Sequence, residues 1–278
     1  YLGAEPTDLN HTIGALWMIS AVARIYQPGA KVDHMLILEG QQGAKKSTIL
    51  RTLAGDQWFT DDLPELGPKD AAIHMQGVWI IEIAELDVMS RADVSKIKAF
   101  MPRATDRFRP PYEKYTIAVP RQCIFAGSVN HDTYLRDETG GRRFWPVRCG
   151  EVIDSVALAR DREQLWAEAV QKFRDGAIWW LVAKEMIAAA NAAQEERYQA
   201  DAWDARIDRW LTHDRRRVNY GYAGGDDWKY EEFERIEPIS DASFGEVMEG
   251  ALGIEPAKWT KGDQMRVSAW FRTRKWEK

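Results

Sequence analysis

The clearest chemical signal in the sequence is a lysine and a serine that follow a turn containing two glycines. Residues 34–55 combine a short apolar run, a turn at Gly40 and Gly43, and an amphipathic helical pattern. A turn between a buried strand and a helix N-terminus directs several backbone N–H groups at one point, which makes an anion site. Lys46 would then contact the β- and γ-phosphates of a nucleotide, and the Ser47 hydroxyl would bind Mg²⁺. The stretch therefore predicts a phosphate-binding loop made of Gly40, Gln42, Gly43, Ala44, Lys45, Lys46, Ser47 and Thr48.

This loop departs from the P-loop pattern G-x-x-x-x-G-K-[ST] at one position. Lys45 stands where the last glycine is usual. A residue with a Cβ atom must tolerate whatever backbone angle the loop imposes there, which a glycine does at no steric cost. An ordinary strand–turn–helix with lysines at its surface therefore stays open as the alternative.

A second apolar run, residues 77–87, ends in carboxylates. The pattern predicts a buried strand with acids at its carboxyl end, where ligands lie in open α/β sheets. A nucleotide hydrolase needs one carboxylate there to hold Mg²⁺ and another group to polarise the attacking water. Glu85 is the first candidate for the metal-binding acid and Glu82 the second. The alternative is a strand end with solvated acids.

A third predicted strand, residues 121–130, ends at Asn130. This asparagine is placed to sense the γ-phosphate or to orient water, although asparagine is also a common turn residue. A glycine pair then precedes Arg142 and Arg143. Permanently charged guanidinium groups suit the stabilisation of a transferring phosphoryl group. The alternative for the two arginines is surface ion pairing.

Positive charge is concentrated in one part of the chain. The whole chain has a net charge of −5, yet residues 96–148 hold eleven Lys or Arg against five Asp or Glu. Residues 103–115 interleave basic and aromatic side chains around two prolines, which predicts an exposed loop or hairpin suited to single-stranded nucleic acid. We expect Lys98 on the outward face of a helix over residues 90–101. The candidate DNA-binding residues are Lys98, Arg107, Arg109 and Tyr112. A solvated arginine-rich hairpin is the alternative.

The composition, 45% hydrophobic and 29% charged residues, is typical of a soluble globular protein. Two cysteines, Cys123 and Cys149, cannot form a disulfide framework, which favours a reducing compartment. No apolar run approaches the roughly 20 residues that span a bilayer. These features predict a cytoplasmic protein without a membrane partner. The chain does not begin with Met, so we expect a piece of a longer protein.

The chain divides by pattern into four predicted regions. Residues 1–30 are expected to be a helical segment, residues 31–211 the nucleotide domain, and residues 212–238 a linker or insertion. Residues 239–278 contain two short helical patterns that fit either a winged-helix-like unit or a plain helical cap.

The order of these motifs resembles the core of superfamily III helicases, which are AAA+-related ATPases of viruses and mobile elements. More closely, the chain resembles the virulence-associated protein E family over about residues 1–210. The resemblance is carried by Leu38-Glu-Gly-Gln-Gln-Gly-Ala-Lys-Lys-Ser47, Trp79-Ile-Ile-Glu-Ile-Ala-Glu-Leu86, Asp106-Arg-Phe-Arg-Pro-Pro-Tyr112, Asn130, and Leu135-Arg-Asp-Glu-Thr-Gly-Gly-Arg-Arg-Phe-Trp-Pro-Val147.

The resemblance implies an α/β P-loop fold, with a parallel sheet and flanking helices, that binds ATP and Mg²⁺. It implies a ring of identical subunits, expected to be a hexamer, that hydrolyses ATP on single-stranded DNA in phage or genomic-island replication. By the same resemblance Glu85 and Glu82 are the Walker B acids, Asn130 is the sensor, and Arg142 or Arg143 reaches a neighbouring subunit. Two alternatives remain: a nucleotide-dependent DNA-binding switch or initiator without unwinding, and a degenerate NTPase that serves as an interaction module.

Overall fold

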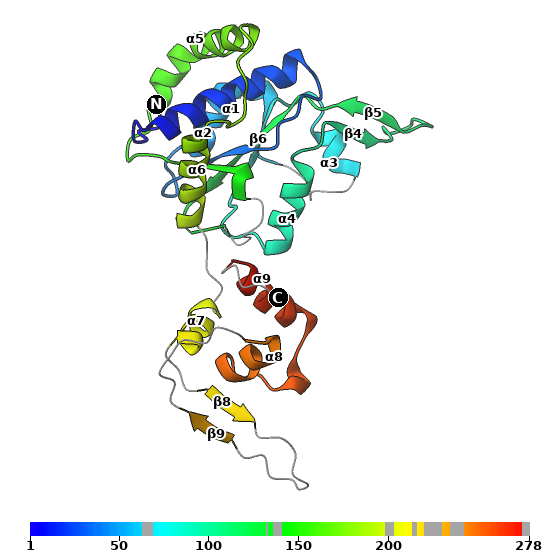
Figure 1. Ribbon diagram of the computed structural model, residues 1–278. Helices are drawn as coiled ribbons and strands as arrows, with labels where there is room; N and C mark the ends of the chain where they lie inside the picture. The colour runs from blue at the N-terminus through cyan, green and yellow to red at the C-terminus, as the bar shows by residue number, and fades with distance from the viewer. Residues whose placement is uncertain are drawn as a thin grey trace. The chain divides into compact units, whose positions relative to one another are not determined.

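In the computed structural model a parallel five-stranded sheet lies at the centre of the unit formed by Tyr1–Gln199 (Figure 1). The model describes residues 1–62, 69–131, 133–135, 141–197, 203–212, 216–219, 230–233 and 242–273. The strand order is β2-β3-β6-β1-β7. The bounds of these strands are β1 Met35–Glu39, β2 Phe59–Thr60, β3 Ile80–Ile83, β6 Ile124–Val129 and β7 Phe144–Arg148. The sheet and the helices around it confirm the predicted α/β class.

Helices cover both faces of this sheet, and strand β1 supplies side chains to both. Leu36 and Leu38 join one core, whereas Met35 and Ile37 join the other, as the period of two in a strand requires. Because both faces are buried, the strands are continuous apolar runs rather than alternating ones. The first core contains residues of α1 (Asp8–Tyr26), α2 (Lys46–Ala54) and α5 (Ser155–Arg174); the second contains residues of α3 (Lys69–His74) and α4 (Arg91–Phe100).

Helix α2, which carries Lys46 and Ser47, is fixed at its far end by α5. The guanidinium group of Arg162 donates hydrogen bonds to the carbonyl oxygens of Leu53, at 2.9 Å, and Ala54, at 3.0 Å. The indole Nε1 of Trp166 donates to the Leu53 oxygen at 2.9 Å. These carbonyls belong to the last turn of α2, where a cation also interacts favourably with the helix dipole. Helix α6 (Lys184–Glu196) packs against β7.

Helix α4 begins after Ser90, whose hydroxyl accepts a hydrogen bond from the Asp93 N–H. Its buried positions include Val94, Ile97, Lys98 and Met101. The expectation that Lys98 points outward is therefore wrong, because residues spaced by three and four share one face of a helix and Lys98 lies on the buried one. Its ammonium group lies 5.4 Å from the centre of the Phe144 ring.

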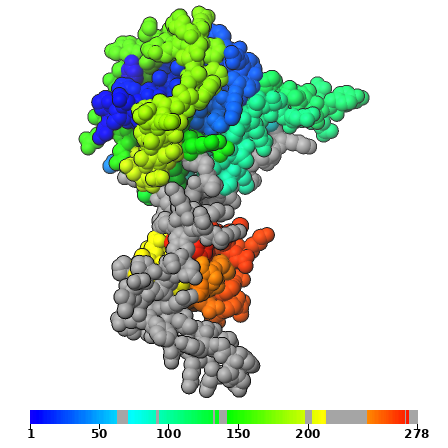
Figure 2. All heavy atoms as spheres, in the orientation of Figure 1, coloured from blue at the N-terminus to red at the C-terminus, as the bar shows by residue number. Residues whose placement is uncertain are grey.

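The basic segment forms an antiparallel hairpin of β4 (Thr105–Phe108) and β5 (Ile117–Pro120), which extends away from the body of its unit (Figures 1 and 2). A buried ion pair fixes the base of the hairpin. Arg121 donates to both carboxylate oxygens of Asp106, at 2.9 and 2.5 Å, and to the carbonyl oxygens of Phe100 and Met101. The fixed base leaves the tip exposed, in agreement with the predicted exposed hairpin.

The chain divides into two units, Tyr1–Gln199 and Ala200–Lys278. The second has its own core, which includes Trp210 of α7, Met248 and Trp270 of α9. Its elements are α7 (Asp204–Thr212), β8 (Arg216–Asn219), β9 (Tyr230–Phe233), α8 (Phe244–Glu246), η3 (Val247–Ala251), η4 (Pro256–Lys258) and α9 (Lys261–Thr273). The predicted linker thus contains an antiparallel strand pair, β8–β9, and the rest of it lies outside the described residues. Within the described ranges no helix is both long and apolar enough to cross a bilayer.

Candidate functional site

Three of the predicted segments meet at the carboxyl edge of the sheet: the loop after β1, the strand end that carries Glu82, and Asn130 after β6. The loop after β1, Asn130 after β6 and the segment after β7 border one cavity of about 700 Å³. Because β1 lies between β6 and β7, the strand order reverses here, and open parallel sheets bind ligands at such a point. The cavity is lined by Gly40, Gln41, Gln42, Gly43, Ala44, Asn130, His131, Arg148, Cys149, Gly150 and Glu151.

Lys46 is the first residue of α2, and its ammonium group is folded over the loop. It donates to the carbonyl oxygens of Gly40, at 2.6 Å, and Gln41, at 2.9 Å, and to Oδ1 of Asn130, at 3.2 Å. Partial burial lowers the pKa of Lys46, while Cys149, Asp87 and Glu82 act in the opposite direction. The structure thus brings together the predicted lysine and the predicted sensor asparagine, and surrounds the ammonium group with acceptors that a phosphate can replace.

Ser47 meets Glu82 rather than Glu85. The Ser47 hydroxyl donates to Oε1 of Glu82 at 2.8 Å, while the buried Oε2 of Glu82 has no hydrogen-bond partner among the described residues. Glu85, which the sequence analysis ranked first, lies beyond the end of β3, where it is exposed and has φ 53°.

A serine hydroxyl beside a carboxylate oxygen with unused lone pairs fits Mg²⁺, which is bound by one or two carboxylates together with substrate phosphates. The surroundings of Glu82 agree with this mode of binding, in which substrate phosphates supply part of the ligands. In the described part of the chain there is no cluster of three or more His, Cys, Asp or Glu side chains that could hold a metal ion by itself.

The loop reaches this geometry through left-handed backbone angles. Gly43 has φ 82°, and Lys45, which caps α2, has φ 61° and ψ 24°. The last position of the pattern therefore does require a left-handed residue, and Lys45 adopts that conformation in spite of its Cβ atom. Gln42, Lys45 and Thr48 are exposed around the loop, and Ala44 is half-buried.

A buried acid at the end of β1 was missed by the sequence analysis. Glu39 accepts hydrogen bonds from Arg197, through Nε at 2.5 Å and Nη2 at 2.9 Å, and from the Tyr134 hydroxyl at 2.9 Å. Burial, reinforced by Glu39, raises the pKa of Tyr134 well above its ordinary value, so the hydroxyl remains a donor. The only local signal is an acid that ends an apolar run, whereas its partner is 158 residues away.

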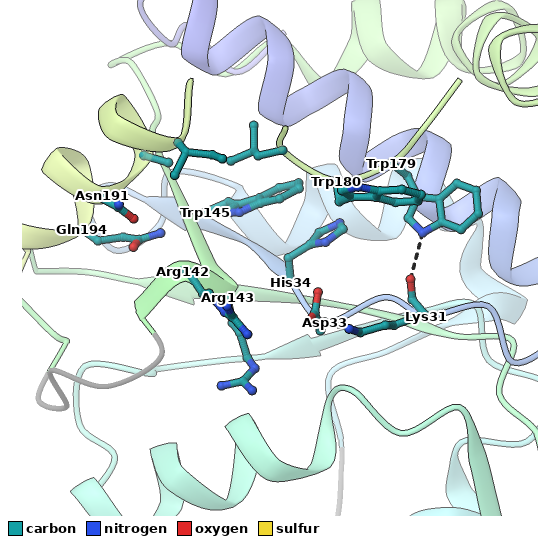
Figure 3. Close-up of a pocket in the computed structure, with 13 residues that line it drawn as sticks. Lys31, Asp33, His34, Arg142, Arg143, Trp145, Trp179, Trp180, Asn191 and Gln194 are labelled. Atoms are coloured by element: carbon teal, nitrogen blue, oxygen red, sulfur yellow. Dashed lines mark hydrogen bonds and ion pairs between the residues drawn. The ribbon is translucent and has the colours of Figure 1, made fainter. Parts of the chain in front are cut away.

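Arg142 and Arg143 lie at the opposite edge of the sheet from the phosphate loop. They end the short helix η2 (Gly141–Arg143), which directly precedes β7, and β7 runs parallel to β1 with Phe144 opposite Met35. Arg142 is exposed and Arg143 is half-buried (Figure 3). Arg148, at the carboxyl end of β7, is the arginine that lines the loop cavity, and the sequence analysis did not single it out.

Three of the predicted DNA-binding residues lie on the hairpin. Arg107 and Arg109 are exposed, and Tyr112, with φ 67°, is fully exposed in the turn between the strands. Lys98 is 6% exposed and does not share that surface. Asp87, another residue not singled out, is buried and has its Oδ2 3.8 Å from Nε2 of His131.

Comparison with known proteins gives one family match and several distant structural matches. A sequence profile described as the virulence-associated protein E-like domain matches residues 1–199. No curated protein sequence matches the chain. The solved structure titled "The apo structure of NrS-1 C terminal region (305-718)" is 15% identical with a TM-score of 0.46, over 76% of this chain and 56% of that one. "The A form apo structure of NrS-1 C terminal region-CTR" is 15% identical with a TM-score of 0.45, over 74% and 54%. The chain spans little more than half the length of these structures.

The left-handed Lys45 leads to a prediction on stability. Lys45→Gly should raise the free energy of unfolding by about 1 kcal/mol. A left-handed backbone angle costs a residue with a Cβ atom roughly 1–2 kcal/mol, and glycine avoids that cost. Part of the gain is lost because glycine also increases the conformational entropy of the unfolded chain. Urea denaturation measures this change. Lys45→Ala, which keeps the Cβ atom and removes the ammonium group, is the control. Equal stabilisation by both substitutions would assign the effect to charge and contradict the backbone argument.

Proposed function

The chain belongs to the virulence-associated protein E-like family, and on that premise we propose that it is a P-loop ATPase of the AAA+ and superfamily III type. The observation that carries the proposal is the group formed by Lys46, Ser47, Glu82 and Asn130 at the carboxyl ends of adjacent parallel strands. Lys46 is buried against its own loop and Asn130, and Glu82 is buried beside Ser47, which a surface strand–turn–helix does not require. The alternative of ordinary surface lysines is therefore disfavoured.

The proposed chemistry follows from the hydrogen bonds that each residue can exchange for contacts with a nucleotide. ATP places its phosphates over the N-terminus of α2, where backbone N–H groups and the helix dipole favour negative charge. Lys46 gives up its bonds to the loop carbonyls and contacts the phosphates instead. Asn130, released from Lys46, is then available to the γ-phosphate or to the attacking water.

Ser47 and Glu82 would hold Mg²⁺ through the hydroxyl and the unpartnered Oε2. When bound, the ion neutralises negative charge on the phosphate oxygens. Glu85, exposed at the same edge, is left as a candidate for polarising water.

The first test is the dependence of ATP turnover on these acids. Glu82→Gln should lower kcat by at least about 10–100-fold, because it removes the metal-binding charge without changing shape. Glu85→Gln should retain the metal dependence of the wild type. Lys46→Ala, which removes the main positive contact with the γ-phosphate, defines the inactive baseline. Turnover is measured by phosphate release across a magnesium titration. An active Glu82→Gln beside an inactive Glu85→Gln would restore the sequence-based ranking, and turnover in Lys46→Ala would rule out the P-loop assignment.

The position of the arginine pair supports a shared active site between subunits. Strand β1 has five residues, so the two edges of the sheet lie about 13 Å or more apart. Arg142 and Arg143 therefore lie at the amino edge, away from the phosphate loop of their own subunit, whereas Arg148 lines the cavity beside that loop. We propose that an arginine of this pair, with exposed Arg142 as the better placed, completes the site of a neighbour in a homo-oligomeric ring, expected to be a hexamer.

Mixing of inactive variants tests this arrangement. Arg142→Ala should bind ATP and lose about 10³–10⁵-fold in turnover, the usual effect of an arginine supplied by a neighbour. Lys46→Ala fails in its own pocket but keeps its arginines. Mixed rings then contain interfaces with an intact pocket on one side and an intact arginine on the other, so ATP turnover should partly recover. Arg143→Ala is tested in parallel. Mixed rings that form without recovery, or a fully active monomer, would contradict the shared site.

We further propose that the β4–β5 hairpin contacts single-stranded DNA and that the ATPase acts in replication of a phage or mobile element, as a helicase. Exposed Arg107 and Arg109 suit phosphates, and exposed Tyr112 suits stacking with a base. Turnover that is coupled to DNA binding without strand displacement would favour the nucleotide-dependent switch or initiator instead. A protein that does not bind ATP would favour the interaction module.

The hairpin's role is tested by the salt dependence of binding. Arg107→Ala with Arg109→Ala should weaken the binding of oligo(dT), and should reduce the slope of log K against log salt by about 1.4, since each phosphate contact on a single strand contributes roughly 0.7. Basal ATP turnover should persist. Arg160→Ala with Lys172→Ala removes equal charge from α5 and is the control. Equal slopes in the two double variants would indicate that the hairpin is a solvated surface that does not contact DNA.

A further inference from the structure

A second cavity, of about 680 Å³, opens at the amino edge of the sheet and takes no part in the proposed ATP site (Figure 3). His34 precedes β1, Trp145 lies near the start of β7, and Trp180 belongs to the segment that leads into α6. We call this space the amino-edge cavity. Its volume falls in the range of sites for small organic ligands.

One wall of the amino-edge cavity offers flat aromatic surface. Beneath it, the buried rings of His34 and Trp145 are stacked on each other with centres 3.7 Å apart and planes 10° apart, so they form part of the base of the wall. Trp179 and Trp180 meet edge to face at 5.2 Å, and the Trp179 indole N–H is already used by the carbonyl oxygen of Lys31 at 2.9 Å. Trp180 is 45% exposed although it lines the cavity, so a large planar side chain stands there without full cover. Such surfaces stack with nucleobases.

Two buried polar atoms of residues that line the cavity have no hydrogen-bond partner among the described residues. They are Nε2 of His34, a residue that is 3% exposed, and Nε of Arg143. Burial, followed by the charge of Arg24, lowers the pKa of His34 to about 3, so the ring is neutral and exchanges ordinary hydrogen bonds. Both atoms are covered by protein, so they mark an imperfectly satisfied inner wall and are not themselves exposed to the cavity.

Asn191, Gln194 and Arg143 complement the edge and the charge of a nucleotide, and the carboxylate of Asp33 lines the same cavity. Asn191 and Gln194 present amide groups from α6, and the Gln194 amide is held by a 2.8 Å hydrogen bond to the Phe144 carbonyl oxygen. Amides pair with the donor and acceptor edges of bases. The half-buried guanidinium group of Arg143 supplies the positive charge that a phosphate requires.

We propose that the amino-edge cavity binds a nucleoside monophosphate unit, with the base against Trp180 and the phosphate on Arg143. A free nucleotide and one nucleotide of a DNA single strand share this chemistry. The site is separate from the P-loop and does not depend on the proposed ATPase activity. Arg142 also lines this cavity and is the more exposed arginine of the pair.

The test measures binding of AMP and of oligo(dT) by isothermal titration in a Lys46→Ala background, which disables the P-loop. Trp180→Ala and Arg143→Ala should each weaken binding by about tenfold or more, the range expected from loss of a stacking platform or a phosphate contact. Trp58→Ala is the matched control, because Trp58 is also 45% exposed and lies on the helix η1 (Asp56–Trp58), outside the cavity. Thermal melting confirms that each variant is folded.

The two ligands distinguish the source of the nucleotide. AMP binding that is lost in Trp180→Ala and kept in Trp58→Ala identifies a free-nucleotide site. The same pattern with oligo(dT) alone identifies a site for a strand, and ultraviolet crosslinks should then map to the peptide that contains Trp179 and Trp180. Absence of binding by both ligands, or equal binding by Trp180→Ala and Trp58→Ala, would overturn the proposal whatever the outcome of the ATP turnover experiments.

Discussion

The buried carboxylate of Glu39 is the constraint on which the arrangement of the site depends. It is 1% exposed at the end of the central strand, where an unpaired charge would be strongly destabilising. Its two oxygens are satisfied by Arg197, which ends α6, and by Tyr134, which follows Asn130 in the chain. The backbone closes the same contact, since the N–H groups of Tyr134 and Leu135 both donate to the Arg197 carbonyl oxygen at 3.0 Å. One charge therefore fixes the start of the phosphate loop, the sensor segment and the end of α6 together.

The direction of the strands divides the chemistry of this unit between two edges. All five strands are parallel, so every carboxyl end lies on the side of Lys46 and every amino end on the side of Arg143. A cation that precedes β7 cannot serve the loop that follows β1 in the same subunit. Under the proposals above, it acts on something brought to the amino edge, either a neighbour's phosphates or a ligand of its own. Both arginines line the cavity at that edge, and Arg142 is the more exposed of the two.

Local patterns predicted several of the elements but not the partners of their side chains. The apolar run, the turn and the helix around Lys46 and the exposed hairpin all follow from spacing within about twenty residues. The preference for Glu85 over Glu82 rested on nearness to the strand end. Which acid meets Ser47 depends instead on the register of β3 beside β6, a long-range property. Lys98 illustrates the same limit. It is a polar residue at a position where the helical spacing is apolar, and the sequence does not show whether its side chain is buried or exposed. The pairing of Glu39 with Arg197 has no local signal from the arginine at all.

Lys45 shows how the requirements of the loop take precedence over the preference of one residue. An alternation of backbone angles that includes left-handed residues is what aims successive N–H groups at one anion, and Gly43 and Lys45 supply the left-handed angles. A lysine held in that conformation costs free energy, of order 1–3 kcal/mol, that other contacts must offset. The bonds from Arg162 and Trp166 to the last turn of α2, the bond of Ser47 to Glu82, and the closure around Glu39 hold both ends of the loop and overdetermine its shape. Under the proposed function, a loop held in this strained shape before any ligand arrives is preorganised for an anion, which gives the strain a use.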